Sequence, residues 1–421
     1  MPDDETRTLS PAAALSAPVP RTAAPGPAPW LLRLVTIGLV LAALNLRPAI
    51  TSLGPLLEEV RGGLHMSGSV AGVLTSVPPL CFAAFGFMAP RLARRFGPTA
   101  VVCAGMVAIT AGLLIRPFVG STAGFVAASA LALMGIAVSN VLMPVIVKRW
   151  FPDRVGSMTG LYSMALALGT ALAAAVTVPM TGVLGGGWQT GLAVWAALAA
   201  VAIVPWVPLV RDRSGTPGQP TARQGRAPAL RITRSRTSWA LACFFGLQAT
   251  AAYITMGWMP QIFRDAGISA GTAGVLLAVT MAMGVPLAFV IPRAAARLRN
   301  QGPIVLVLGG CGLLGYAGLY LAPAGGAWLW ALLLGIANCA FPLALTMIGM
   351  RSRTGAGVVR LSAFAQSTGY LLSIPGPLLV GVLYQHSGGW GLPLALMAGL
   401  LVPQMIAGVL AGRDRTIEDE C

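Results

Sequence analysis

One arginine stands where a membrane-spanning helix would need an apolar residue. Arg47 lies inside the apolar run 31–57, within the sequence Asn45-Leu46-Arg47-Pro48. A guanidinium in hydrocarbon costs on the order of 2.5–3.5 kcal/mol, so it survives only where it faces a bundle interior or a watery cavity. We therefore interpret Arg47 as the fixed positive pole of a solute-binding site. The alternative is a structural arginine that bonds the backbone carbonyls left free where Pro48 interrupts the helix.

Carboxylates are missing from the deep parts of the expected spans. Glu58 and Glu59 stand at the predicted outer end of the first span, and Asp265 lies beyond the seventh. A buried proton relay of Asp or Glu, common in pumps, is therefore not expected. An arginine without an acidic partner favours an anionic or strongly dipolar solute. Coupling through a protonated solute, coupling through Glu58 and transport without coupling all stay open.

Other polar side chains interrupt apolar stretches, and buried polar atoms need partners, which a cavity shared by several spans would supply. The predicted solute-site residues are Asn45, Arg47, Thr51, Asn140, Tyr162, Gln248, Tyr253, Trp258, Asn338, Gln366 and Tyr370. Packing between helices is the alternative for Asn140 and Asn338, and an interfacial anchor is the alternative for Trp258. Arg116 is a second charged candidate near the end of the third span, although snorkelling to the membrane surface explains it more simply.

The composition indicates a membrane protein. Of the 421 residues, 56% are hydrophobic and 10% are charged, whereas about 25% of a soluble domain is charged. At roughly 20 apolar residues per span, we expect an all-α polytopic protein with twelve transmembrane helices. They are predicted at about 32–57, 68–89, 99–119, 122–147, 156–180, 190–210, 239–262, 270–291, 303–322, 327–349, 358–383 and 391–411. The net charge of +16 does not indicate nucleic-acid binding, because the basic residues lie in short loops between spans.

Those basic residues also predict the orientation. They follow the even-numbered spans, so the positive-inside rule places both termini in the cytoplasm of a multi-pass protein of the cell membrane. The set includes Arg91, Arg95, Lys148, Arg149, Arg293 and Arg297. A role at a cytoplasmic gate is the alternative for these residues.

The sequence carries no signature of an enzyme. Five of the six cysteines fall inside apolar spans, without a CxxC pair or a metal-ligand spacing. We predict no catalytic residues, no metal and no cofactor. The expected partners are a small-molecule substrate, with a coupling proton left open, and the lipid bilayer, and we expect a monomer.

An internal repeat with an offset near 200 residues divides the chain. Residues 71–74, Ala-Gly-Val-Leu, recur at 273–276, and residues 50–51, Ile-Thr, recur at 254–255. Two six-helix halves in the same orientation are parallel repeats, the arrangement of the major facilitator fold, in which the substrate lies between the halves. The predicted segments are a disordered cytoplasmic N-terminal tail (1–30), an N-terminal bundle (31–210), a cytoplasmic linker (211–237), a C-terminal bundle (238–412) and a cytoplasmic C-terminal tail (413–421).

Several motifs together resemble one family of that superfamily. The sequence Asn-Leu-Arg-Pro at 45–48 with Thr-Ser-Leu-Gly-Pro-Leu-Leu at 51–57 is similar to the first helix of the cyanate permease and 2-nitroimidazole exporter (CynX/NimT-like) family. Residues 140–144, 257–260 and 365–372 are similar to further stretches of that family. The resemblance covers about residues 32–411 and implies a secondary transporter of small solutes. The loop at 91–97 lacks the acidic residue of the general superfamily pattern.

We therefore predict a secondary transporter that moves a small anionic or polar planar solute, cyanate- or nitroimidazole-like, through a central cavity by alternating access. A broad-specificity drug or metabolite exporter is the first alternative. Arg47 argues against it, because an unpaired buried cation penalises cationic amphiphiles. A non-transporting membrane sensor or scaffold is the second alternative, and it would need a soluble domain that segments 1–30 and 211–237 are too short and too polar to form.

Overall fold

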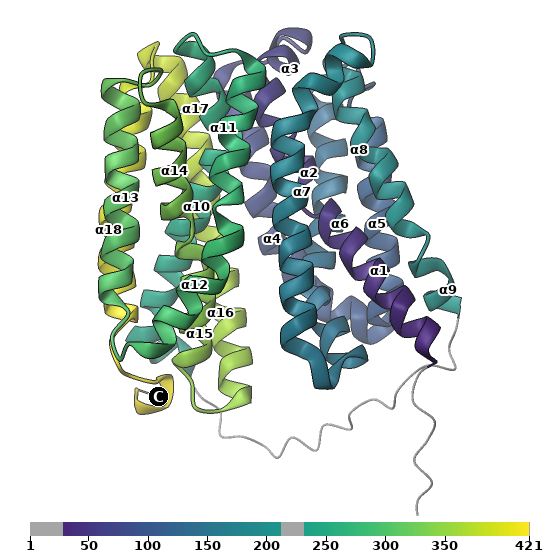
Figure 1. The fold of residues 1–421 in the computed structure, drawn as a ribbon, viewed down its shortest axis with the longest axis vertical. Coiled ribbons are helices and arrows are strands. Elements are labelled where there is room, and N and C mark those ends of the chain that lie inside the picture. The colour runs from purple at the N-terminus through teal and green to yellow at the C-terminus, as the bar shows by residue number, and fades with distance from the viewer. Residues whose placement is uncertain (1–27, 212–230, 421) are drawn as a thin grey trace, which may run out of the picture.

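The computed structural model describes residues 28–211 and 231–420, which form a bundle of helices (Figure 1). Most of the predicted N-terminal tail and linker, residues 1–27 and 212–230, lies outside the described residues. Helix α1 (Pro29–Asn45) begins and the last described residues end at the same end of the bundle, which we name the termini end. The opposite end carries α3 (Leu57–Gly63), and we name it the α3 end.

The N-terminal half places six apolar segments side by side. Its further elements are α2 (Pro48–Thr51), η1 (Gly54–Leu56), α4 (Gly68–Phe96), α5 (Pro98–Ile115), α6 (Thr122–Trp150), η2 (Pro152–Arg154), α7 (Val155–Val183), α8 (Trp188–Ile203) and α9 (Trp206–Arg211). Helices α4 and α6 are capped by Ser67 and Ser121, whose hydroxyls accept from the backbone N–H groups three residues later.

The first span is broken at Arg47. Helix α1 ends at Asn45, residues 46 and 47 form a turn, and α2 starts at Pro48 with Arg47 as its N-cap. Proline has no N–H to donate and disfavours a helical residue before it, so the break follows from the sequence. Carbonyls next to such a break lose their intrahelical donors and need other partners.

The C-terminal half repeats this architecture. Its elements are η3 (Ile232–Arg234), α10 (Arg236–Asp265), α11 (Ala270–Ala282), α12 (Gly284–Arg297), α13 (Gly302–Leu321), α14 (Ala327–Asn338), α15 (Ala340–Met350), α16 (Gly355–Ser373), α17 (Pro375–Ser387), α18 (Gly391–Ala411) and η4 (Ile417–Asp419). Three spans contain short breaks, between α11 and α12, between α14 and α15, and between α16 and α17.

Eleven helical segments of the described residues are long and apolar enough to cross a membrane. The twelfth predicted position, 190–210, holds the shorter apolar helix α8 and, after a turn at Val204 and Pro205, helix α9. Residues 190–210 therefore form two consecutive helices, because a proline cannot donate the hydrogen bond that would continue α8. The remaining predicted spans each coincide with one of the eleven segments.

Small residues let the two halves approach closely. Helix α7 runs along α11, and α4 runs along α17. A Cβ added at Gly274 of α11 would lie 2.5 Å from the carbonyl oxygen of Ala174, and one added at Gly72 of α4 would lie 2.9 Å from that of Leu378. These two glycines are equivalent members of the recurring Ala-Gly-Val-Leu motif. The motif thus marks two of the places where the halves pack backbone against backbone.

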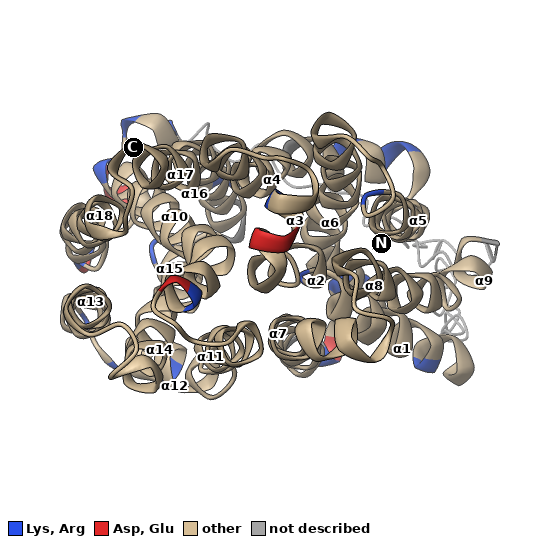
Figure 2. Ribbon diagram, turned by 90° about the horizontal axis from the view of Figure 1, so that it is seen from above, with Lys and Arg blue, Asp and Glu red and all other residues tan. Residues whose placement is uncertain are grey.

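Polar contacts join the halves at the α3 end. The Arg264 guanidinium of α10 lies 2.8 Å from the Glu59 carboxylate and 3.1 Å from that of Glu58, both on α3. The Ser69 hydroxyl of α4 donates to Gln385 Oε1 of α17 over 2.7 Å. Figure 2 shows the acidic turn of α3 between the two halves at this end. We name the Arg264, Glu58 and Glu59 group the α3 latch.

Candidate functional site

Arg47 lies at the boundary between the two halves and is half-buried. Its guanidinium carbon is 5.9 Å from the centroid of the Phe82 ring on α4. Tyr253 on α10 interacts electrostatically with the same guanidinium. The helix break therefore turns Arg47 out of the N-terminal bundle and towards the C-terminal half.

Three aromatic rings surround this arginine. The Phe82 ring centroid lies 5.2 Å from that of Tyr370 on α16 and 6.4 Å from that of Tyr253. All three aromatic side chains are buried. Their separations are those of favourable aromatic pairs. We name Arg47, Phe82, Tyr253 and Tyr370 the Arg47 cluster; it takes side chains from both halves.

The Arg47 cluster carries an uncompensated positive charge. The ion pairs described within residues 28–211 and 231–420 include those of Arg264, Arg351 and Arg353, and none of them includes Arg47. The guanidinium thus faces an aromatic ring rather than a carboxylate. Such a group binds an anion or a strongly dipolar oxygen without first having to break an ion pair.

Arg116 lies deeper than the sequence suggests. It is 1% exposed at the end of α5, and its Nη1 donates to the carbonyl oxygen of Ala49 over 2.8 Å. Its Nη2 lies 3.4 Å from Ser52 Oγ, and its guanidinium carbon lies 5.8 Å from the Phe125 ring centroid. The expectation of snorkelling is wrong, because the broken first span offers carbonyl oxygens that attract the guanidinium inward.

Two predicted residues, Gln248 and Asn338, meet inside the C-terminal half. Gln248 Nε2 on α10 donates to the side-chain and backbone oxygens of Asn338, each over 2.9 Å. Gln404 Nε2 of α18 donates to Gln248 Oε1 over 3.2 Å. This network closes the gap left where α14 ends at Asn338. Both amides are engaged within one half, apart from the Arg47 cluster.

Three predicted residues bond their own half instead. Asn45 is fully buried and donates to the carbonyl oxygens of Leu41 and Leu198, so its amide faces α8. The Thr51 hydroxyl donates to the carbonyl oxygen of Arg47 over 3.2 Å and so stabilises the break. Gln366 Nε2 donates to Ser362 Oγ along α16 over 2.7 Å. The structure does not bring these side chains to the Arg47 guanidinium.

Trp258 is buried near the α3 end rather than beside Arg47. Its ring lies 6.2 Å from that of Tyr384 and 5.9 Å from that of Trp390. Asp265 Oδ2 accepts hydrogen bonds from Tyr384 over 2.8 Å and from Trp390 over 2.7 Å. These aromatic side chains position the end of α10, which carries Arg264 of the α3 latch.

Asn140 and Tyr162, on α6 and α7, are half-buried. From Asn140 towards the termini end, one face of α6 becomes exposed at Pro144, Val145 and Lys148, while the neighbouring Ile146 and Val147 are buried. Pro144 lies four residues after Asn140, and Lys148 lies four residues after Pro144, so these three share one side of the helix. Asn140 thus lies one turn before the exposed part of this side of α6.

The predicted gate residues lie at the termini end of their helices. Arg91, Arg95, Lys148, Arg293 and Arg297 are exposed, and Arg149 is half-buried. The described contacts of two of them stay local. Arg293 donates to the carbonyl oxygen of Phe289, and Arg95 lies 5.2 Å from the Phe96 ring centroid.

Two residues close to the arginines were missed by sequence reasoning. Phe82 and Ser129 belong to apolar helices and carry no distinguishing mark in one sequence. The internal repeat does not point to Phe82 either, because the equivalent position in the C-terminal half carries no charged residue.

Among the described residues, no group of three or more His, Cys, Asp or Glu is arranged to hold a metal.

The family model of the Major Facilitator Superfamily matches residues 35–358. The chain belongs to this superfamily. An uncharacterized transporter of Bacillus subtilis, YycB, is 37% identical over 92% of this chain and 94% of its own length. The 2-nitroimidazole transporter of Escherichia coli is 33% identical over 91% of this chain and 97% of its own. The cyanate transport protein CynX of Escherichia coli is 30% identical over 87% of this chain and 94% of its own length.

A solved structure has the same fold at low sequence identity. The crystal structure of a D-xylose-proton symporter superposes with a TM-score of 0.70 and 14% identity, covering 92% of this chain and all of that one. The fold predicted from composition and the internal repeat, an all-helical membrane transporter of two halves, is thereby confirmed. The resemblance read from the first-span motif is confirmed by the nitroimidazole and cyanate relatives.

Proposed function

We propose that this superfamily member moves a small anionic or polar planar solute across the membrane by alternating access, with the Arg47 cluster as its binding site. The observation that carries the proposal is the unpaired guanidinium of Arg47 between rings from both halves. A solute held there touches both halves at once. Its binding energy can therefore favour one arrangement of the halves over another.

The chemistry of the cluster suits two kinds of solute. A guanidinium presents planar, paired donors to two oxygens of a nitro or carboxylate group, or to one small anion. The rings of Phe82 and Tyr370 offer flat apolar surface to a planar ring. The relatives are named for a nitroimidazole and for cyanate, which represent these two kinds of solute.

The conformation of the bundle supports access of a solute to the Arg47 cluster from one side of the membrane. The α3 latch and the Ser69 to Gln385 bond hold the halves together at the α3 end. Towards the termini end, α6 is exposed at Pro144, Val145 and Lys148. With the orientation predicted from the loop charges, this conformation is closed to the outside and accessible from the cytoplasm. Alternating access then requires the latch to separate.

The decisive experiment measures transport in proteoliposomes. Uptake and efflux of radiolabelled cyanate, 2-nitroimidazole and small aromatic carboxylates are compared for the wild type, Arg47→Gln and the control Arg33→Gln. Arg33 is exposed on the same span, so its loss leaves the cluster intact. We expect Arg47→Gln to lose at least about tenfold in kcat/KM, since a charge-assisted bond contributes about 1.5–3 kcal/mol. Unchanged transport by folded Arg47→Gln protein contradicts the proposed site.

A broad-specificity exporter of apolar compounds is the second candidate, because the cluster is mainly aromatic. The same proteoliposome assay distinguishes the broad-specificity exporter from the proposed anion or dipole transporter. An exporter of this kind transports lipophilic cations such as ethidium, and its activity rises when Arg47 is neutralised. The proposed anion or dipole transporter loses activity with that change. Imposing a pH gradient in the same assay tests proton coupling.

A further inference from the structure

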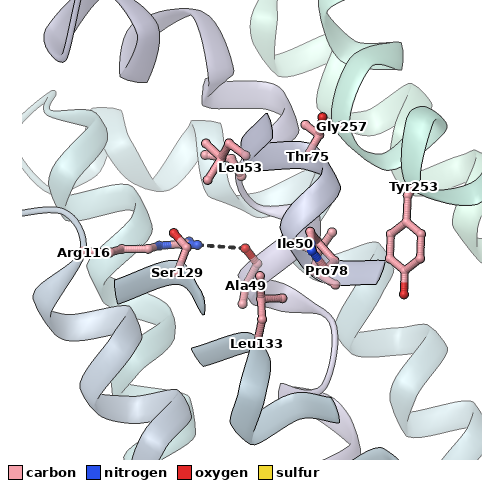
Figure 3. Close-up of a pocket in the computed structure, with 11 residues that line it drawn as sticks. Ala49, Ile50, Leu53, Thr75, Pro78, Arg116, Ser129, Leu133, Tyr253 and Gly257 are labelled. Carbon is pink, nitrogen blue, oxygen red and sulfur yellow. Dashed lines mark hydrogen bonds between the residues drawn. The ribbon is translucent and has the colours of Figure 1, made fainter. Parts of the chain in front are cut away.

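A second positively charged cavity lies beside the Arg47 cluster. It is enclosed between the broken first span, α4, α5, α6 and α10, and it has a volume of about 20 Å³. Figure 3 shows Arg116 reaching across it to the carbonyl oxygen of Ala49, with Ser129 next to the guanidinium. Thr75 and Tyr253 also line it. A water molecule needs at least about 10–15 Å³ on this measure, so one small species fits.

The polar atoms around this cavity are not satisfied by the protein. Arg116 has five N–H donors, yet its Nε has no partner and its described bonds go to Ala49 and Ser52. Ser129 is 3% exposed and its Oγ also has no partner. Among the described ion pairs, none includes Arg116. A charge buried without a counter-charge is strongly destabilising.

We propose that the Arg116 cavity is a binding site for a single monovalent anion of the size of chloride, held by Arg116 Nε and the Ser129 hydroxyl. A negative charge there compensates the buried guanidinium and satisfies both orphan donors. The volume excludes a ring and suits a spherical ion better than a linear three-atom anion. The inference does not depend on which solute the Arg47 cluster transports. Tyr253 lines this cavity and also interacts electrostatically with Arg47, so the two sites are neighbours.

Crystals of the full-length protein soaked in sodium bromide give a direct test. Bromide replaces chloride and scatters anomalously, so we expect one anomalous peak within hydrogen-bonding distance of Arg116 Nε and Ser129 Oγ. A cavity that holds only a water molecule, or a bromide peak at Arg47 alone, overturns the proposal. This readout is independent of transport, so it remains valid if the proposed function fails.

A solution test uses thermal unfolding of the purified protein, followed by tryptophan fluorescence. Replacing sodium gluconate with sodium chloride at constant ionic strength should raise the unfolding midpoint, because chloride binds the folded state. Ser129→Ala should raise the chloride concentration for half of this shift by about tenfold, as expected for a lost bond to a charged group. Ser139→Ala is the matched control, since Ser139 is another buried, unpartnered hydroxyl of α6 outside this cavity. Equal chloride responses of both variants and the wild type contradict the proposal.

Discussion

Arg264 Nη1 lies 2.8 Å from Glu59 Oε2 and thereby joins the end of α10 in the C-terminal half to α3 in the N-terminal half. Arg264 is only 17% exposed in its side chain, and its Nη1 also donates to the carbonyl oxygen of Pro55. The pair therefore holds a backbone segment as well as a carboxylate. Because the halves must separate here for the solute site to reach the α3 end, this bond belongs to one conformation only.

Glu59→Gln is expected to increase the population that is open at the α3 end. An ion pair at the protein surface contributes about 1 kcal/mol or less, so the ratio of open to closed molecules should rise by up to about fivefold. Distance distributions between spin labels on α3 and α11 measure this ratio. The double exchange Glu59→Arg with Arg264→Glu should restore the wild-type distribution. If the distance distribution is unchanged in Glu59→Gln as well as in the double exchange, the role of the α3 latch is contradicted.

Gly54→Ala is expected to act in the same direction through sterics. A Cβ at Gly54 would lie 2.4 Å from the carbonyl oxygen of Met256 on α10, and a backbone atom cannot move aside cheaply. The halves should then fail to close fully at the α3 end. Accessibility of a cysteine introduced in η1 to a membrane-impermeant maleimide should rise. Gly62→Ala is the control, because a Cβ there meets nothing within 4 Å; the same rise in both variants would refute the argument.

The place of Arg47 could be predicted because its position depends on local chemistry. The span length puts it deep in the bilayer, Pro48 breaks the helix at that point, and the repeat puts the first span next to the other half. The position of Asn45 could not be predicted in the same way. It stands two residues earlier, and residues two apart on a helix do not share a face, so its amide meets α8 instead.

The burial of Arg116 was beyond sequence reasoning for a different reason. Its partner is the carbonyl oxygen of Ala49, 67 residues away in sequence, which is available only because the first span is broken. Residue types do not show which backbone carbonyl groups will be free to accept a hydrogen bond from a distant side chain. A sequence pattern shows that an arginine stands near a helix end, but the acceptor that draws it inward is a property of the folded break.

Arg351→Ala is expected to destabilise the termini end of the C-terminal half. Arg351 is 2% exposed and donates to the carbonyl oxygens of Ala411 and Gly412, each over 2.9 Å, and to Gln301. Its loss leaves several buried acceptors unpaired, which costs about 1–3 kcal/mol for each group left unsatisfied. The unfolding midpoint in detergent should therefore fall by several degrees.

The matched control for Arg351 is Arg353→Ala. Arg353 is 64% exposed in its side chain and pairs with Asp419 over 2.6 Å. An exposed pair contributes at most about 1 kcal/mol. We expect a small change in midpoint for this variant, and comparable losses for the two variants would show that burial of Arg351 is not the cause.

Acidification is expected to release the C-terminal residues from the start of α10. Glu420 accepts from the Ser235 hydroxyl over 2.7 Å and from the Thr237 N–H and hydroxyl, each over 2.9 Å. Partial burial opposes ionisation, but these hydrogen bonds outweigh it and lower the pKa of the Glu420 carboxyl. A carboxyl with a lowered pKa in the folded state stabilises that state fully above its unfolded pKa of about 4.3. The contribution is lost as the pH falls through the lower, folded value.

Hydrogen exchange of the first turn of α10 measures this release. Protection of residues 236–239 in the wild type should decrease between pH 5 and pH 3, after correction for intrinsic exchange rates, whereas Glu420→Gln should show the weaker protection at both pH values. Glu418→Gln is the control, because Glu418 bonds Ser352 and the N–H groups of Arg353 and Thr354 instead. That variant should loosen the turn before α16 and leave the pH response of α10 unchanged. If the pH response of the wild type persists in Glu420→Gln, the release depends on another group, because the side-chain amide of glutamine does not titrate between pH 5 and pH 3.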